Sequence, residues 1–125
     1  MPLRVLYVDD EPDIREIVSL SLSLDPDIEA ETAPSGAAAL ERAKTGNLDL
    51  ILLDVMMPEM DGPTTLGHLR AEPGTASIPV AFVTARTQHH EVEHFRGLGA
   101  VGVVAKPFDP MTLAQTVRNL HATAG

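Results

Sequence analysis

The sequence predicts an α/β domain built on a doubly wound, five-stranded parallel sheet with helices on both faces. Three observations lead to this fold class. The chain has 125 residues, which suits one domain over residues 1–125 and leaves little room for a second. Short apolar runs of strand type alternate five times with segments of helical spacing. Parallel strands in such an alternation need crossover connections, and right-handed crossovers place helices on both faces of the sheet.

Five strands are expected where apolar, β-type residues run together between turn signals. They cover residues 3–8, 28–33, 49–53, 79–83 and 101–105. The third run is continuously apolar from Leu50 to Leu53, which is typical of a central parallel strand that is buried on both faces. The second run is acidic on alternate residues, and we therefore expect it near an edge of the sheet.

Five helices are expected after the strands. The first four cover residues 12–24, 36–44, 63–71 and 88–98. Pro12 has acidic neighbours, as is usual in a first helical turn, and Ser35 can cap the second helix. Leucine and serine alternate over residues 18–24 and mimic a strand, but the crossover between the first two strands requires a helix there.

The last helix is expected to begin at Asp109. This residue suits an N-cap, and Pro110 suits the first turn that follows it. Leu113, Val117 and Leu120 then have the spacing of a buried helical stripe. The tail, residues 121–125, is interpreted as a frayed end or the start of a linker.

Composition excludes several classes of protein. The chain has no cysteine, which rules out disulfides and thiolate metal sites. Its net charge of −9 should be repelled by nucleic acid phosphates, so direct contact with nucleic acid is not expected. No apolar run approaches the length of a membrane span, and residues 1–4 show no secretory signal, so we expect a cytoplasmic protein without membrane contact.

Polar residues follow four of the five expected strands. Asp9 and Asp10 follow the first, Asp54 the third, Thr84 the fourth and Lys106 the fifth. In open parallel sheets, ligands bind just outside the carboxyl ends of the strands, so these side chains should converge on one rim.

Such a group favours phosphate chemistry assisted by a metal. Three carboxylates in one pocket repel one another and need a cation. Oxygen ligands without histidine or cysteine favour Mg²⁺, or the similar Mn²⁺, over zinc or copper. Magnesium commonly takes a phosphate as a further ligand, Lys106 is suited to a phosphate oxygen, and a carboxylate can itself become phosphorylated.

At these residues the chain resembles the receiver domains of two-component response regulators, the CheY-like domains, over essentially its whole length. The matching features are the acidic pair after the first strand, Asp54 followed by residues 57–62 (Met-Pro-Glu-Met-Asp-Gly), Thr84, and Lys106 followed by Pro107. Each feature alone is weak, but together and in this order they are specific. The resemblance implies a flavodoxin-like strand order of 2-1-3-4-5.

The resemblance also implies roles for these residues in a phosphorelay. Asp54 would be the phosphoacceptor, and it would receive the phosphoryl group from a sensor histidine kinase or a histidine phosphotransfer protein. Asp10 and Asp54 would bind Mg²⁺ directly, together with the backbone carbonyl of Met56, while Asp9 would act through a bound water. Thr84 and Lys106 would contact the phosphoryl group.

Further expectations follow from the same resemblance. The peptide bond between Lys106 and Pro107 would be cis, which turns the ammonium group into the pocket. The signal would pass to a downstream protein target, or to an output domain outside these residues, through the surface of the fourth helix, fifth strand and fifth helix. The domain would not be an enzyme, except for its own phosphorylation and slow dephosphorylation.

Three positions depart from the family pattern. Val103 stands where such domains often carry an aromatic switch residue, which puts aromatic coupling to Thr84 in doubt. Met56 and Arg86 flank the phosphorylation site at positions that orient the hydrolytic water in some members. Because the Met56 side chain cannot orient water, we hypothesise a long-lived phosphorylated Asp54.

Two enzyme classes are rivals to this interpretation. A hydrolase of the haloacid-dehalogenase type could use Asp54 as nucleophile, but it needs a second aspartate two residues on, where this chain has Met56. His90 to His94 matches the zinc-protease pattern H-E-x-x-H. Helical spacing, at about 100° per residue, places these histidines opposite Val92 and Phe95, so they should face water and not a cleft.

Overall fold

The computed structural model describes residues 2–124 and contains one five-stranded parallel sheet of strand order β2-β1-β3-β4-β5. The strands are β1 (Leu3–Val8), β2 (Ile28–Ala33), β3 (Leu50–Asp54), β4 (Val80–Thr84) and β5 (Gly102–Ala105). The helices are α1 (Pro12–Ser23), α2 (Gly36–Lys44), α3 (Gly62–Ala71), α4 (His89–Gly97) and α5 (Leu113–Ala124). The predicted fold class and strand order are confirmed.

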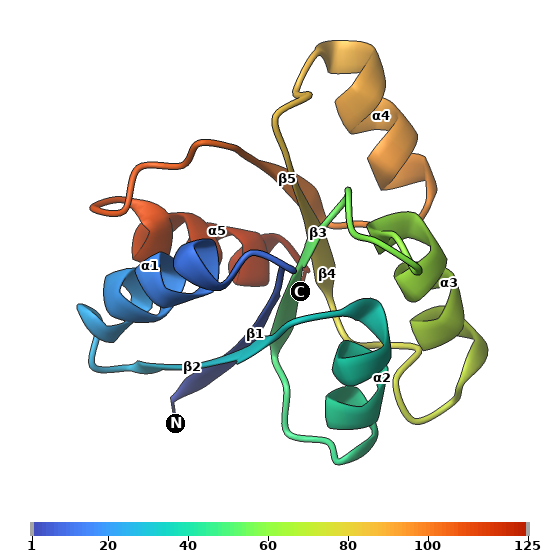
Figure 1. Ribbon diagram of the computed structural model, residues 1–125, viewed down its shortest axis with the longest axis horizontal. Coiled ribbons are helices and arrows are strands. Elements are labelled where there is room, and N and C mark those ends of the chain that lie inside the picture. Colours follow the sequence, from blue (N-terminus) through green and yellow to red (C-terminus); the bar gives the residue numbers. More distant parts are fainter. Residues whose placement is uncertain (1, 125) are drawn as a thin grey trace.

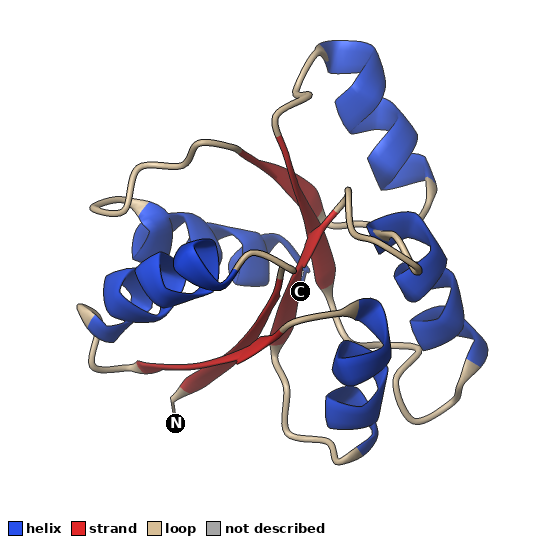
Figure 2. Cartoon of the chain, in the orientation of Figure 1, coloured by secondary structure: helices blue, strands red, loops and turns tan. Residues whose placement is uncertain are grey.

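The sheet lies between two helical layers, with α1 and α5 on one face and α2, α3 and α4 on the other (Figures 1 and 2). Successive side chains of a strand point to opposite faces, so β1 contributes to both cores. Its Val5 and Tyr7 belong to the cluster under α1 and α5, and its Leu6 and Val8 to the cluster under the other three helices. The strand β3 is buried along its whole length, as expected for a central strand.

The strand β2 lies at one edge of the sheet, as its alternating acidic residues predict. Glu29 and Glu31 are exposed there. Arg42 of α2 holds Glu31 through two nitrogens, with Nε–Oε1 and Nη2–Oε2 distances of 2.8 and 2.6 Å. Charged side chains on an edge strand discourage pairing with another chain.

The last helix begins later than predicted. Helix α5 starts at Leu113, and Asp109 instead is the first residue of a turn that precedes the helix. The Asp109 carboxylate accepts a hydrogen bond from the backbone N–H of Met111 (2.9 Å), and its carbonyl accepts one from that of Thr112 (3.1 Å). The tail is not frayed over residues 121–124, because helix α5 continues through Ala124; Gly125 lies outside the described residues, and the alternative of a linker stays a prediction.

The leucine and serine alternation does not prevent helix α1, because burial selects the helical face. Val18, Ser21 and Leu22 are buried with helical spacing. The Ser21 hydroxyl donates to the carbonyl of Pro110, which satisfies this buried polar group and ties α1 to the segment before α5. Among residues 2–124, no helix is long and apolar enough to cross a membrane.

Candidate functional site

The parallel register brings four strand ends to one rim. Val8 pairs with Leu53, which places the acidic pair after β1 beside Asp54 at the end of β3. On the other side Asp54 is paired with Val83, so Thr84 follows directly at the end of β4. The backbone N–H of Lys106 then donates to the carbonyl of Thr84 at 2.9 Å. Residues up to 97 positions apart therefore surround one pocket.

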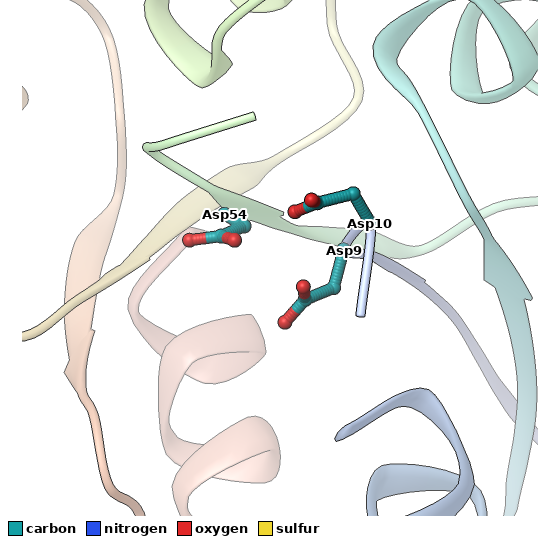
Figure 3. Close-up of side chains that lie close together, drawn as sticks. All are labelled: Asp9, Asp10 and Asp54. Atoms are coloured by element: carbon teal, nitrogen blue, oxygen red, sulfur yellow. The ribbon is translucent and has the colours of Figure 1, made fainter. Parts of the chain in front are cut away.

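Three carboxylates form the centre of this pocket (Figure 3). One oxygen each from Asp9, Asp10 and Asp54 lies within 4.8 Å of the others. Asp9 is fully buried, Asp54 is 5% exposed and Asp10 is exposed. A set of hard oxygen donors in this arrangement fits Mg²⁺ or Mn²⁺ and does not fit a metal that prefers nitrogen or sulfur.

The Asp9 carboxylate is held by three donors. Its Oδ1 accepts a hydrogen bond from the backbone N–H of Glu11 at 3.0 Å. Its Oδ2 accepts two, from the Tyr7 hydroxyl at 2.6 Å and from the Lys106 ammonium at 2.9 Å. Arg15 in turn donates to the Asp9 backbone carbonyl at 2.7 Å. Asp9 is therefore a fixed, fully satisfied group, while Asp10 presents its carboxylate to solvent.

The Lys106 ammonium bridges two of the carboxylates. Besides its contact with Asp9, its Nζ lies 3.4 Å from Asp54 Oδ2. The peptide bond that links Lys106 to Pro107 is cis. The Lys106 side chain is 20% exposed, so solvent screens its charge only in part. The lysine is thus the resident counter-ion of the pocket.

Burial and charge move the two buried carboxyls in opposite directions. Burial, followed by the charge of Asp9, raises the pKa of Asp54 to about 6. Burial also acts to raise the pKa of Asp9, but the hydrogen bonds from Tyr7, Glu11 and Lys106 outweigh it and hold this pKa below its usual range. Asp9 therefore stays ionised, while Asp54 becomes a carboxylate only close to neutral pH unless a cation is added.

The Thr84 hydroxyl can donate a hydrogen bond into the pocket. It is 6% exposed, and its Oγ1 accepts a hydrogen bond from the backbone N–H of Arg86 at 3.0 Å. That contact uses an oxygen lone pair and leaves the hydroxyl proton available to a further oxygen atom.

The loop between β3 and α3 is shaped around Asp54. Glu59 has a positive φ of 68°, and Asp61 caps α3 by accepting from the Thr64 N–H at 2.8 Å. The Gly62 N–H donates to the Val55 carbonyl at 2.9 Å. A Cβ at position 62 would lie 2.6 Å from the Asp54 backbone oxygen, so this close approach requires glycine.

A hollow of about 620 Å³ opens beside Thr84, and the two histidines of the H-E-x-x-H segment contribute to its lining. The prediction that His90 and His94 face no cleft is therefore wrong, although both are exposed as expected. The reason is that α4 stands apart from the other helices (Figure 1), and the hollow lies between α4 and the segments that follow β3 and β4. Within residues 2–124, the histidines form no metal-binding cluster with two further ligands; only the three aspartates do.

The positions that depart from the family pattern lie around the same rim. Met56 is 81% exposed and lines the hollow together with Arg86. Val103 is half-buried and packs against the core cluster under α2, α3 and α4.

Sequence reasoning missed Tyr7. The side-chain alternation of the first strand could have indicated this contact, because residues 7 and 9 lie on the same face of the strand. A tyrosine in an otherwise aliphatic strand, two residues before a buried aspartate, can bring its hydroxyl to that carboxylate.

Comparisons with known proteins agree with this geometry. The family model of response regulator receiver domains matches residues 5–118. Rre1, a response regulator of Synechocystis sp., is 36% identical over 97% of this chain, and Rrf1 of Nitratidesulfovibrio vulgaris is 34% identical over 98%. The DNA-binding transcriptional regulator RpaA of Synechocystis sp. is 35% identical over 94%.

The structure of the chemotaxis response regulator CheY4 of Vibrio cholerae is similar throughout, with a TM-score of 0.87 and 34% identity over 96% of this chain and 99% of that one. The chain spans 52% of Rre1 and 48% of RpaA, and 86% of Rrf1. The family match, the strand order and the acidic rim agree, and the chain belongs to the response regulator receiver domains.

Proposed function

We propose that Asp54 is the phosphoacceptor of this receiver domain and that Mg²⁺ or Mn²⁺ at Asp9, Asp10 and Asp54 supports its phosphorylation. The observation that carries the proposal is the position of Asp54, which lies among two further carboxylates, the Lys106 ammonium and the end of β4. Asp10 and Asp54, with the Met56 carbonyl, would hold the ion. The three hydrogen bonds on Asp9 favour an indirect role for that carboxylate.

The phosphodonor is a phosphohistidine on a sensor histidine kinase or a histidine phosphotransfer protein. An oxygen of Asp54 attacks the phosphorus atom, and an acyl phosphate forms. The P–N bond breaks, its electron pair returns to the imidazole, and that nitrogen takes up a proton. Lys106 and the Thr84 hydroxyl contact the phosphoryl oxygens, and catalysis consists of alignment and charge neutralisation. A bound divalent cation would neutralise further negative charge at this point.

The domain acts on no substrate other than itself, and phosphorylation changes its protein-binding surface. We place that surface on α4, β5 and α5, with Val103 in place of the aromatic relay. The target is a downstream protein or an output domain of the kind that RpaA's name implies. The net charge of −9 argues against direct contact of this domain with nucleic acid. Acidity is also the norm for cytoplasmic domains, and we place the protein in the cytoplasm.

Intact mass after incubation with Mg²⁺ and acetyl phosphate tests the proposal. We expect one phosphoryl adduct in the wild-type protein and none in Asp54→Asn, which lacks the nucleophile. A phosphatase would consume acetyl phosphate without accumulating the adduct. An adduct of undiminished yield in Asp54→Asn would show that another residue is the acceptor.

Mg²⁺ is expected to raise the melting temperature of the wild-type protein. The ion binds the folded site and relieves the repulsion among the carboxylates, so it stabilises the folded state by mass action. Asp10→Ala should remove this response in a thermal melt. An unchanged wild-type melting temperature at saturating Mg²⁺ would contradict the metal site.

The acyl phosphate on Asp54 is expected to survive for much longer than seconds. The Met56 side chain offers only a thioether, which accepts hydrogen bonds too weakly to orient an attacking water. Mass measurements over time, after removal of acetyl phosphate, give the lifetime. A Met56→Asn variant, which supplies an amide at this exposed position, should lose the label faster; complete loss from the wild type within seconds would refute the expectation.

A further inference from the structure

The Tyr7 side chain lies beneath the acidic pocket, on the face of β1 that α1 and α5 cover. It is 1% exposed, and its hydroxyl lies 2.6 Å from Asp9 Oδ2. Its ring meets the Phe108 ring edge-on, with centroids 6.5 Å apart and planes at 80°. Tyr7 thus reaches the pocket through a single polar atom on a ring that its neighbours hold in place.

Tyr7 and Lys106 donate to the same oxygen. The Lys106 Nζ lies 2.9 Å from Asp9 Oδ2, so this atom accepts two hydrogen bonds at once. Asp9 is fully buried, and its other oxygen accepts only from the Glu11 N–H among the described residues. A buried carboxylate that loses donors without replacement is costly, so each of these bonds matters when another is broken.

Under the proposed function, Lys106 must also contact the phosphoryl group on Asp54. Its ammonium lies 3.4 Å from Asp54 Oδ2, and a phosphoryl group on Asp54 would draw it away from Asp9. The Tyr7 hydroxyl cannot follow the ammonium, because its ring is buried in the core cluster under α1 and α5 and packs against Phe108.

We propose that Tyr7 is a positioning residue for phosphotransfer: its hydroxyl keeps Asp9 Oδ2 satisfied and frees the Lys106 ammonium to move to the phosphoryl group. This inference rests on the proposed function, in which Lys106 contacts the phosphoryl oxygens. Without the Tyr7 hydroxyl, Lys106 would be the one side-chain donor left to Oδ2 among the described residues, and the lysine would be held at Asp9.

The first test measures phosphorylation rates. Tyr7→Phe keeps the buried ring and removes only the hydroxyl, so circular dichroism should show a folded protein. We expect its rate of labelling by acetyl phosphate at saturating Mg²⁺ to fall about tenfold, as for the loss of one hydrogen bond to a charged group. Thr75→Val is the matched control: it removes a buried hydroxyl that donates to the Leu69 carbonyl at 2.7 Å, outside the acidic pocket, and it should label within about twofold of the wild type.

A double-mutant cycle separates positioning from packing. In the Lys106→Ala background no ammonium has to leave Asp9, so Tyr7→Phe should change the residual labelling rate by less than about twofold. A purely structural role would produce the same tenfold loss in both backgrounds and would overturn the inference.

The second test uses fluorescence and does not depend on a phosphorylation rate. Tyr7 is the only tyrosine and the chain has no tryptophan, so the emission excited near 280 nm reports this hydroxyl alone. A carboxylate acceptor quenches tyrosine, so Asp9→Asn should brighten the protein. After phosphorylation the wild type should remain quenched, because Tyr7 stays on Asp9. Emission that rises to the Asp9→Asn level would overturn the inference.

The two proposals fail in different ways. If the wild-type protein gains no adduct, the proposed function fails, whatever the fluorescence shows. If the wild type is labelled and Tyr7→Phe is labelled equally fast, only the role of Tyr7 fails.

Discussion

Replacing Lys106 by alanine is expected to lower the free energy of unfolding of the metal-free protein by about 3 kcal/mol and to slow the phosphorylation of Asp54 by about two orders of magnitude. The stability loss arises because the ammonium group, 20% exposed, is the counter-ion of both Asp9 and Asp54. Its removal leaves two buried carboxylates facing each other. The rate loss arises because the phosphoryl oxygens lose a charged donor.

Urea unfolding at neutral pH, with and without Mg²⁺, measures the first effect, and labelling by acetyl phosphate measures the second. Mg²⁺ should recover part of the lost stability, since the ion replaces the missing positive charge. Lys44→Ala is a matched control: Lys44 is the only other lysine, it is 60% exposed, and its contact with Glu41 is a surface pair. Equal losses in the two variants would show that the pocket does not depend on Lys106.

Replacing Asp54 by asparagine is expected to stabilise the metal-free protein above about pH 6 while it abolishes phosphorylation. The pKa of Asp54 is raised from 3.8 to about 6 in the folded protein. Between these values the folded protein retains a proton that the unfolded chain has released, so the free energy of unfolding of the wild type falls as pH rises. Asparagine does not titrate and avoids this loss.

The expected gain approaches about 3 kcal/mol well above pH 6, which is the raised pKa converted to free energy; the favourable contact with Lys106 is already included in that pKa. The difference in free energy of unfolding should disappear as pH falls below about 4, where the wild-type Asp54 carboxyl is protonated in both the folded and the unfolded state. Asp9, whose pKa is held low, loses its own stabilising effect in acid, but this occurs in both proteins and largely cancels in the difference.

Thermal melts of both proteins across this pH range, without divalent cations, measure the gain. With saturating Mg²⁺ the order should reverse, because the wild type gains the metal's binding energy and the variant loses a ligand. A stability difference that stays constant from pH 4 to pH 8 would contradict the raised pKa of Asp54.

Much of the fold and of the site could be predicted from local patterns. The continuous apolar run of β3 and the alternating acids of β2 indicate a central and an edge strand, and the structure places them there. The polar residues at four strand ends predict a common rim, because parallel strands all end at the same edge of the sheet. These conclusions hold because strand burial and strand direction depend on short stretches of sequence.

Other features depend on distances between segments that are far apart in the chain. The spacing of residues does not show that Tyr7 and Lys106 share one oxygen of Asp9, nor that α4 leaves a hollow in which His90 and His94 stand. The start of α5 was misplaced for a similar reason, because Asp109 suits a helix cap and a preceding turn equally well and packing against α1 selects between them.

The sequence by itself determined the sheet and the identity of the residues that meet at its rim, and its resemblance to receiver domains supplied the order of the strands. Only the tertiary structure decided that Asp9 and Asp54 are buried while Asp10 is exposed, and that Asp54 is the carboxyl that holds its proton toward neutral pH. The physical reason is that a pKa depends on burial and on charges within a few ångströms. At Asp9 those neighbours include Tyr7 and Lys106, and at Asp54 they are Asp9 and Lys106. Tyr7 comes from β1 and Lys106 from the segment that directly follows β5, so their distances to the carboxyls depend on the folded sheet.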